Sequence, residues 1–248
     1  MVYRMGHAMI WNDASGAPRV ACLMPTTSAR RAFWPLAVTN FAAQSYENAA
    51  LFVATDGAFA EDGVPRCSCR VSAASTLGDK YNGLHQWAID DGAEWLALWS
   101  DDDWQSSSSI AYRMAAIAPG VRRIGYRSLW FCDLRGDGAM YRFQAEPSST
   151  EQWVAHLSML IHRSVWLESA GYPDQQVSSD TGFQHRIRKV RSTVVDDAGT
   201  MIAIQHQRNT YKQRIDRLRR WHRPDVTLES LMGIIAAEQY RAAAREIA

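Results

Sequence analysis

The chain has 248 residues, of which 47% are hydrophobic and 21% charged, and its net charge is +1 at pH 7. These proportions exclude wholesale disorder, and the length suits one large domain with or without a helical appendage. The longest charge-free stretch, 32–46, contains Thr39, Asn40 and Gln44 and falls short of the roughly 20 apolar residues that a membrane-spanning helix needs.

The first half of the chain alternates short apolar segments with helical patterns. Buried strands are predicted at residues 19–25, 50–55, 67–71 and 94–99. Helices are predicted at about residues 29–44, 79–90 and 110–118. This alternation predicts a mostly parallel α/β sheet, which binds ligands outside the carboxyl ends of its strands. Thr26, Asp56 and residues 101–103 all follow such strand ends.

The second half has a less regular pattern. A D-G turn within residues 135–138 predicts a hairpin between strands at 122–134 and 139–143. A strand at 157–162 and a short helix at 164–170 follow. The last predicted element is a helix over 226–247, capped by Thr227 or Asp225. Helical spacing places its inner face at Leu228, Leu231, Met232, Ile235 and Gln239. We therefore expect one domain over residues 1–223, with a C-terminal helix at 224–248 packed on it.

The four cysteines are too few and too scattered to form a disulfide framework. Residues 1–7 lead into only a few apolar residues, which does not suit a secretory signal. We therefore expect a cytoplasmic protein with reduced thiols.

Three consecutive aspartates, 101–103, close the fourth predicted strand. Like charges this close oppose one another's ionisation, and burial strengthens the conflict. Mg²⁺ or Mn²⁺ resolves it, because such ions prefer oxygen ligands and usually take one or two carboxylates together with phosphate oxygens. The alternative is a solvated acidic turn that caps the helix after Ser106.

Five segments carry further motifs, in a fixed order along the chain. They are a strand and loop at 20–31; Gln44, Ser45, Tyr46 and Asn48 followed by Asp56-Gly57; Gly78, Lys80 and Asn82 followed by the aspartate run and Trp104; Asp180, Phe183 and Arg186; and His206, Asn209 and Thr210. In this order they resemble the family 2 glycosyltransferases of the GT-A fold. The resemblance covers roughly residues 20–210.

The resemblance implies a GT-A fold, a Rossmann-like and mostly parallel α/β sheet flanked by helices, with a C-terminal helical extension. It implies a nucleotide-sugar-binding half at 19–134 and an acceptor and catalytic-base half at 135–223. The implied activity is transfer of a sugar from a nucleotide-diphosphate sugar, with a UDP-sugar as the first choice, to an acceptor hydroxyl. The implied contacts to the nucleotide base and ribose are Pro25, Thr26 and Asp56, with Lys80 and Asn82 nearby.

The aspartate run would hold Mn²⁺ or Mg²⁺ on the donor's diphosphate. As a D-x-D motif, the pair is Asp101 and Asp103. Aligned on the aromatic Trp104, the metal ligand instead falls on Asp102, and Ser100 takes the place of the aspartate usual in the family. We favour Asp102 as the metal ligand, with Asp101 and Asp103 as second choices, and we also expect Asp101 to contact the donor.

His206 follows an apolar strand, where a lone histidine is more often an ordinary core or turn residue. The functional alternative is a third metal ligand on a loop that closes over the donor. Arg208 could then contact the phosphates.

Asp180 is the candidate general base for the acceptor hydroxyl, and its alternative role is a helix N-cap. Direct displacement with an aspartate base would invert the anomeric centre, with an oxocarbenium-like transition state.

Residues 182–223 contain eleven Lys or Arg and three Asp, a net charge of +8, which leaves −7 for the remainder. Within this region, the basic stretch 185–223 is either a solvated surface or an acceptor groove for a polyanion, where Trp153 or Trp221 could stack on a base. The acceptor therefore stays open among a glycan, a small molecule and nucleic acid, the last as in phage enzymes that glycosylate hydroxymethylated pyrimidines in DNA. A nucleotidyltransferase and a non-catalytic nucleotide-binding relative are further alternatives, but the loop 25–31 lacks the glycines of the former.

Overall fold

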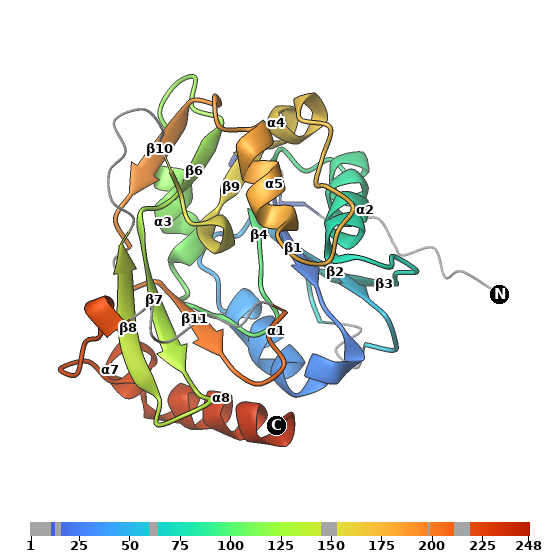
Figure 1. The fold of residues 1–248 in the computed structure, drawn as a ribbon. Coiled ribbons are helices and arrows are strands. Elements are labelled where there is room, and N and C mark those ends of the chain that lie inside the picture. The colour runs from blue at the N-terminus through green and yellow to red at the C-terminus, as the bar shows by residue number, and fades with distance from the viewer. Residues whose placement is uncertain (1–10, 13–15, 60–63, 145–152, 198, 211–218) are drawn as a thin grey trace.

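The computed structural model describes residues 11–12, 16–59, 64–144, 153–197, 199–210 and 219–248 (Figure 1). Its larger sheet has seven strands in the order β10-β6-β9-β4-β1-β2-β3. Their bounds are Ser192–Val195, Arg123–Tyr126, Leu160–His162, Trp95–Leu98, Val20–Pro25, Ala49–Thr55 and Cys67–Val71. Only β9 runs antiparallel to its neighbours, so the sheet is mostly parallel, as predicted.

Helices cover both faces of this sheet. On one face lie α2 (Leu77–Asp90), α4 (Arg163–Glu168) and α5 (Ser179–Arg186), and on the other lie α1 (Trp34–Ala42) and α3 (Ser109–Ala115). Successive residues of β1 alternate between the two cores, and every residue of the strand is buried. This two-sided burial explains why the strand is apolar throughout.

A second sheet has four strands in the order β5-β11-β7-β8. They are Trp104–Gln105, Met201–Gln205, Ser128–Asp133 and Ala139–Gln144. Helix α8 (Ile234–Glu246) packs on one face of this sheet through Ala237 and Tyr240, and lies beneath it in Figure 1. Because β5 follows β4 after only five residues, residues 99–103 pass directly from the first sheet to the second.

Three predicted elements before the terminal helix differ from the structure. The strand predicted at 122–134 is two strands, β6 and β7, which belong to different sheets and separate at the exposed Arg127. The strand predicted at 157–162 is only β9, because His156–Ser158 form a 3-10 turn. The helix predicted at 29–44 begins as a 3-10 helix, η2 (Ser28–Phe33), with a kink at Arg30 before α1.

The predicted terminal helix is broken at Gly233, whose φ of +86° lies outside the helical region. It forms α7 (Leu228–Met232), which Thr227 caps as predicted, and α8. The break changes which face is buried. Ile235, predicted to face inward, is 75% exposed, and Tyr240 takes the inner position instead.

Among the described residues, no helix is long and apolar enough to cross a membrane.

Candidate active site

A cavity of about 1150 Å³ lies between the carboxyl ends of β1, β2 and β4 and one face of the second sheet. Its polar wall comes from the first sheet and includes Thr26, Asp56 and Asp101–Asp103. Its apolar wall comes from the second sheet and includes Phe131 and Phe143. The three adjacent parallel strands thus bring together side chains that are far apart in the sequence, as the strand-end pattern predicted.

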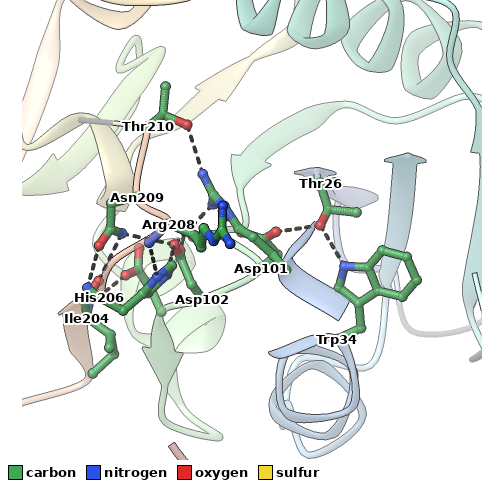
Figure 2. A network of polar contacts seen from close by, with 12 residues as sticks. Thr26, Trp34, Asp101, Asp102, Ile204, His206, Arg208, Asn209 and Thr210 are labelled. Atoms are coloured by element: carbon green, nitrogen blue, oxygen red, sulfur yellow. Dashed lines mark hydrogen bonds and ion pairs between the residues drawn. The ribbon is translucent and has the colours of Figure 1, made fainter. Parts of the chain in front are cut away.

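Asp101 is buried and paired at both carboxylate oxygens. Its Oδ1 accepts a hydrogen bond of 2.7 Å from Arg30, and its Oδ2 accepts one from the Thr26 hydroxyl. That hydroxyl in turn accepts a hydrogen bond from Nε1 of Trp34, 2.7 Å away (Figure 2). Burial raises the pKa of Asp101, and the Arg30 guanidinium opposes the rise. The contacts fix Asp101 to the end of β1 and to η2.

Asp102 accepts four hydrogen bonds, and Figure 2 shows it at the centre of the polar network. The Ser100 hydroxyl donates to Oδ1 at 2.6 Å. Three nitrogen donors surround Oδ2, namely Arg30 at 3.0 Å, His206 Nε2 at 3.0 Å and Asn209 Nδ2 at 3.1 Å. Burial acts to raise the pKa of Asp102, but Arg30 and the His206 hydrogen bond outweigh it and hold the pKa below its ordinary value. The Asp102 carboxylate is therefore ionised at neutral pH.

Asp103 differs from its two neighbours because one of its oxygens is unpaired. Its Oδ1 accepts from the main-chain N–H of Ile204 at 2.9 Å, whereas its buried Oδ2 has no hydrogen-bond partner among the described residues. Burial and the charge of Asp102 raise the pKa of Asp103 well above its ordinary value. Asp103 therefore retains its proton more readily than Asp102 does.

The predicted third ligand, His206, lies beneath Asp102 and stacks on Phe33 with ring centroids 4.7 Å apart. Its Nδ1 accepts the main-chain N–H of Arg208 at 3.0 Å. In the neutral ring the proton is therefore on Nε2, which donates to Asp102. A metal-bound histidine usually donates its other N–H to an acceptor, whereas here Nδ1 faces a donor. The geometry thus favours His206 as a residue that orients Asp102.

Besides Asp101, four predicted donor-binding residues line the cavity. They are Pro25, Thr26, Asp56 and Lys80. Nζ of Lys80 donates to the carbonyl of Thr26 at 2.8 Å, and Oδ1 of Asp56 accepts the main-chain N–H of Ser28 at 2.7 Å. Burial lowers the pKa of Lys80, against the raising effect of Asp56. Lys80 and Asp56 therefore both contact the main chain of the loop that follows β1.

Two other predicted donor contacts are absent from the cavity lining among the described residues. Asn82 instead forms two hydrogen bonds with the main chain of Tyr172, at 2.7 and 2.9 Å. Nε of Arg208 donates to the carbonyl of Ile247 at the end of α8, 3.1 Å away. Both side chains thus connect elements of the fold, because each reaches a main-chain carbonyl rather than the cavity.

The candidate base, Asp180, lies in the first turn of α5 and lines the cavity. It does not cap the helix, because the N-cap residue is Ser178, in a left-handed conformation with a φ of +62°. The Asp180 carboxylate forms no hydrogen bond or ion pair with any residue that the structure describes. The carboxylate of Asp180 is therefore not engaged by any described residue around the cavity.

Residues that the sequence analysis did not select also form the cavity. Arg30 pairs with two of the three aspartates, and His156 lies near Asp180. The pKa of His156 is lowered to about 4 by burial, which outweighs the raising effect of Asp180, so its ring is neutral. Arg30 follows the turn after the first strand, and this position was its only signal in the sequence.

Aromatic side chains form a continuous cluster on the apolar wall. The ring of Phe143 lies 4.8 Å from Trp221, 5.6 Å from Trp153 and 6.3 Å from Phe131, measured between centroids. The guanidinium of Arg220 stacks 4.0 Å over Trp221. Flat rings of ligands stack well on such walls.

The basic stretch 185–223 lies only partly within the described residues. Lys212, Arg214 and Arg217 fall outside them. Arg186 donates to the carbonyls of Ala170 and Gly171, at 2.9 and 2.5 Å, so it supports the turn before α5. Of the described basic residues in the stretch, Arg220 lines the cavity.

The carboxylate oxygens at the cavity wall fit a divalent cation that takes its remaining ligands from a diphosphate. No group of three or more His, Cys, Asp or Glu within the described ranges could hold a metal ion. However, Asp102 and the unpaired oxygen of Asp103 offer hard oxygen ligands at the cavity wall, and ions such as Mg²⁺ usually need no more from a protein when phosphates are present. The guanidinium of Arg30 already contacts Asp102, and its positive charge opposes the binding of a cation there.

The fold is that of the GT-A glycosyltransferases, and the structural neighbours of this chain are nucleotide-sugar glycosyltransferases. TarS of S. aureus (residues 1–349) in complex with UDP-GlcNAc has a TM-score of 0.59 and 12% identity, over 77% of this chain and 60% of that one. The mannosyltransferase PcManGT from Pyrobaculum calidifontis, in complex with GDP-Man and Mn²⁺, has a TM-score of 0.55 and 13% identity, over 81% and 62%.

The chain thus spans about three fifths of the length of the solved structures that it resembles. No protein-family model and no curated protein matches the chain. The expected GT-A fold is therefore confirmed, whereas membership of family 2 stays a prediction.

Proposed function

We propose that the chain is a glycosyltransferase that moves a sugar from a nucleotide-diphosphate sugar to an acceptor hydroxyl. The observation that carries the proposal is one cavity that holds both the aspartate run at the strand ends and the unpaired carboxylate of Asp180. Its volume of about 1150 Å³ exceeds the roughly 300–1,000 Å³ of common ligand pockets, so there is room for a donor and an acceptor.

The donor would occupy the polar wall. Pro25, Thr26 and Asp56 would contact the base and ribose, and Lys80 lies beside them to attract the diphosphate. The neighbours with bound UDP-GlcNAc and GDP-Man support a nucleotide-sugar donor, and we propose a UDP-sugar first. In this assignment residues 19–134 form the donor half and residues 135–223 the acceptor half.

Mn²⁺ or Mg²⁺ would be held by Asp102 together with Asp103, and the donor's phosphates would complete its ligands. A bound cation offsets the negative charge that develops on the leaving diphosphate. His206, Ser100 and Asn209 hold the Asp102 carboxylate in one orientation through their hydrogen bonds. The Mn²⁺ in the Pyrobaculum calidifontis neighbour supports this proposal.

Asp180 would act as general base on the acceptor hydroxyl. Its carboxylate takes the proton as the hydroxyl oxygen attacks the anomeric carbon and the bond from that carbon to the diphosphate breaks. The sugar passes through an oxocarbenium-like transition state. Because one displacement occurs at one centre, the proposed reaction inverts the anomeric configuration.

The acceptor would meet the aromatic wall that Phe143, Trp153 and Trp221 form. Sugar rings of a glycan, rings of a small molecule and nucleobases all present flat faces to such a wall. Arg220 on Trp221 supports nucleic acid as a second candidate, since exposed bases bind to aromatic platforms flanked by cations. Binding that falls steeply with added salt would distinguish this candidate from a neutral glycan.

A nucleotidyltransferase or a non-catalytic relative could have the same fold. One assay distinguishes both of them from a glycosyltransferase. Hydrolysis of a panel of nucleotide sugars, with Mn²⁺ and then with chelator, tests the proposal. We expect release of a nucleoside diphosphate with at least one donor and its loss on chelation. A panel with no hydrolysis, or cleavage to a nucleoside monophosphate and a sugar 1-phosphate instead, would contradict it.

A further inference from the structure

Arg30 occupies an unusual place in the cavity. Its side chain is 16% exposed and lines the cavity, and one guanidinium nitrogen contacts Oδ1 of Asp101 at 2.7 Å and Oδ2 of Asp102 at 3.0 Å. The other terminal nitrogen donates to the hydroxyl of Thr210 at 2.8 Å. A single guanidinium thus joins the loop after β1 to both the aspartate run and the loop after β11.

Arg30 is also the one permanent cation among the three nitrogen donors around Oδ2 of Asp102. Asn209 is a neutral amide, and His206 uses Nδ1 to accept the N–H of Arg208 while Nε2 faces Asp102. A divalent cation bound to this oxygen would face the guanidinium at close range, and the two positive charges would repel each other. Binding of the cation to Asp102 therefore requires Arg30 to leave.

The surroundings offer Arg30 a second anion once a donor is present. The guanidinium is at the cavity wall, its contact with Thr210 lies on the exposed side, and its backbone sits at the kink of η2, with φ −113° and ψ 15°. A guanidinium pairs with phosphate oxygens in the same forked geometry that it uses with carboxylates.

We propose that Arg30 is a built-in counter-ion that competes with the divalent cation for Asp102 and moves to the donor's diphosphate when cation and donor bind together. The diphosphate part rests on the proposed function. The competition couples the binding of the two ligands. The free energy needed to move Arg30 away from Asp102 is required only once when both ligands bind. Cation and nucleoside diphosphate must each raise the affinity of the other by the same factor.

The test measures binding of Mn²⁺ to the full chain without any nucleotide, from the electron paramagnetic resonance signal of the free ion. In Arg30→Met, Asp102 loses its competing charge, so we expect Mn²⁺ to bind about tenfold more tightly than in the wild type, within the usual range of coupling. Arg31→Met is the matched control, because Arg31 is the adjacent, exposed arginine outside this cavity, and it should leave the affinity unchanged.

A second titration measures UDP with Mn²⁺ present. We expect Arg30→Met to bind UDP more weakly than the wild type and to lose most of the mutual enhancement between Mn²⁺ and UDP. Arg30→Gln, which keeps a hydrogen-bond donor without the charge, serves if the methionine variant does not fold, as judged by its circular dichroism.

An unchanged or weaker affinity for Mn²⁺ in the folded Arg30 variants would overturn the proposal. Failure of the proposed function has a different signature, namely a wild-type chain that binds no nucleoside diphosphate at any Mn²⁺ concentration. Tighter Mn²⁺ binding in the variants would still support the competition in that case, since it is measured without nucleotide.

Discussion

The hydroxyl of Tyr240, on α8, donates a hydrogen bond of 2.9 Å to the main-chain carbonyl of Asp103. The same hydroxyl accepts from Nδ2 of Asn40, on α1, at 2.8 Å. The C-terminal helix therefore does more than cover the second sheet. It supports the main chain that carries the aspartate run.

Tyr240→Phe should remove both hydrogen bonds and leave the buried Asp103 carbonyl unsatisfied. We expect the free energy of unfolding to fall by about 1–3 kcal/mol, and the affinity for UDP with Mn²⁺ to fall as well. Urea denaturation and calorimetry check the two effects. Tyr112→Phe is the matched control, because the Tyr112 hydroxyl donates to the carbonyl of Asp196 at the surface. Equal losses in the two variants would contradict a special role for Tyr240.

Asp180→Asn should abolish transfer and spare donor binding. The amide cannot take a proton from the acceptor, and a general base commonly contributes about 10²–10⁴-fold in rate. The turnover number is measured with the best donor of the hydrolysis panel, and affinity for UDP by calorimetry. Asp196→Asn, at an exposed position, is the control. Full turnover in Asp180→Asn would show that Asp180 is not the general base.

Asn82→Ala distinguishes a contact to the donor from a support of the fold. Asn82 holds the main chain of Tyr172, and the Tyr172 ring stacks on Phe183 of α5 at 4.1 Å, so its loss should loosen the helix that carries Asp180. We expect a loss of about 1–3 kcal/mol in stability and lower turnover, with the affinity for UDP unchanged. A large loss of UDP affinity at unchanged stability would instead indicate that Asn82 contacts the donor.

Two buried histidines should make stability depend on pH. Burial lowers the pKa of His85 to about 3 and that of His156 to about 4, from the ordinary 6.5. Between pH 6.5 and about 4 the unfolded chain binds protons that the folded chain does not, so these groups stabilise the fold above pH 6.5 and lose that contribution as the pH falls.

The difference between wild type and His85→Phe isolates one of these groups from the carboxylates that titrate nearby. We expect the wild type to lose up to about 1.4 kcal/mol more per pH unit than the variant below pH 6.5, in urea unfolding at pH 7, 6 and 5. The exposed His185→Phe is the control. Parallel pH profiles for wild type and His85→Phe would mean that His85 takes up a proton in the folded chain as readily as in the unfolded chain.

Much of the fold followed from local pattern. Strands buried on both faces, such as β1 and β2, are apolar throughout, and their ends predicted the positions of Thr26, Asp56 and the aspartate run. The strand predicted at 122–134 was wrong because β6 and β7 are both buried throughout, and the single exposed Arg127 between them did not predict a change of sheet. Gly233 marked the break in the terminal helix only ambiguously, since single glycines also occur inside helices.

The site was predicted less completely, because hydrogen-bond partners depend on the tertiary fold. Asn82 and Arg208 are polar residues in the expected segments, yet their partners are the main chain of Tyr172 and of Ile247. His206 was found by its position, but its hydrogen-bonding role depends on the N–H of Arg208. Arg30 was missed, since only the tertiary contact with Asp101 and Asp102 distinguishes it from Arg31.

The proposed function depends on Asp102, which would bind a divalent cation that holds the donor's diphosphate. Calorimetric titration of UDP into the wild type and into Asp102→Asn, each with Mn²⁺ and with chelator, tests this role. We expect chelation to weaken UDP binding by the wild type at least about tenfold and Asp102→Asn to bind weakly under both conditions. The surface variant Asp137→Asn should behave as wild type. Equal affinity for UDP with Mn²⁺ and with chelator, or full Mn²⁺ dependence in Asp102→Asn, would contradict this role.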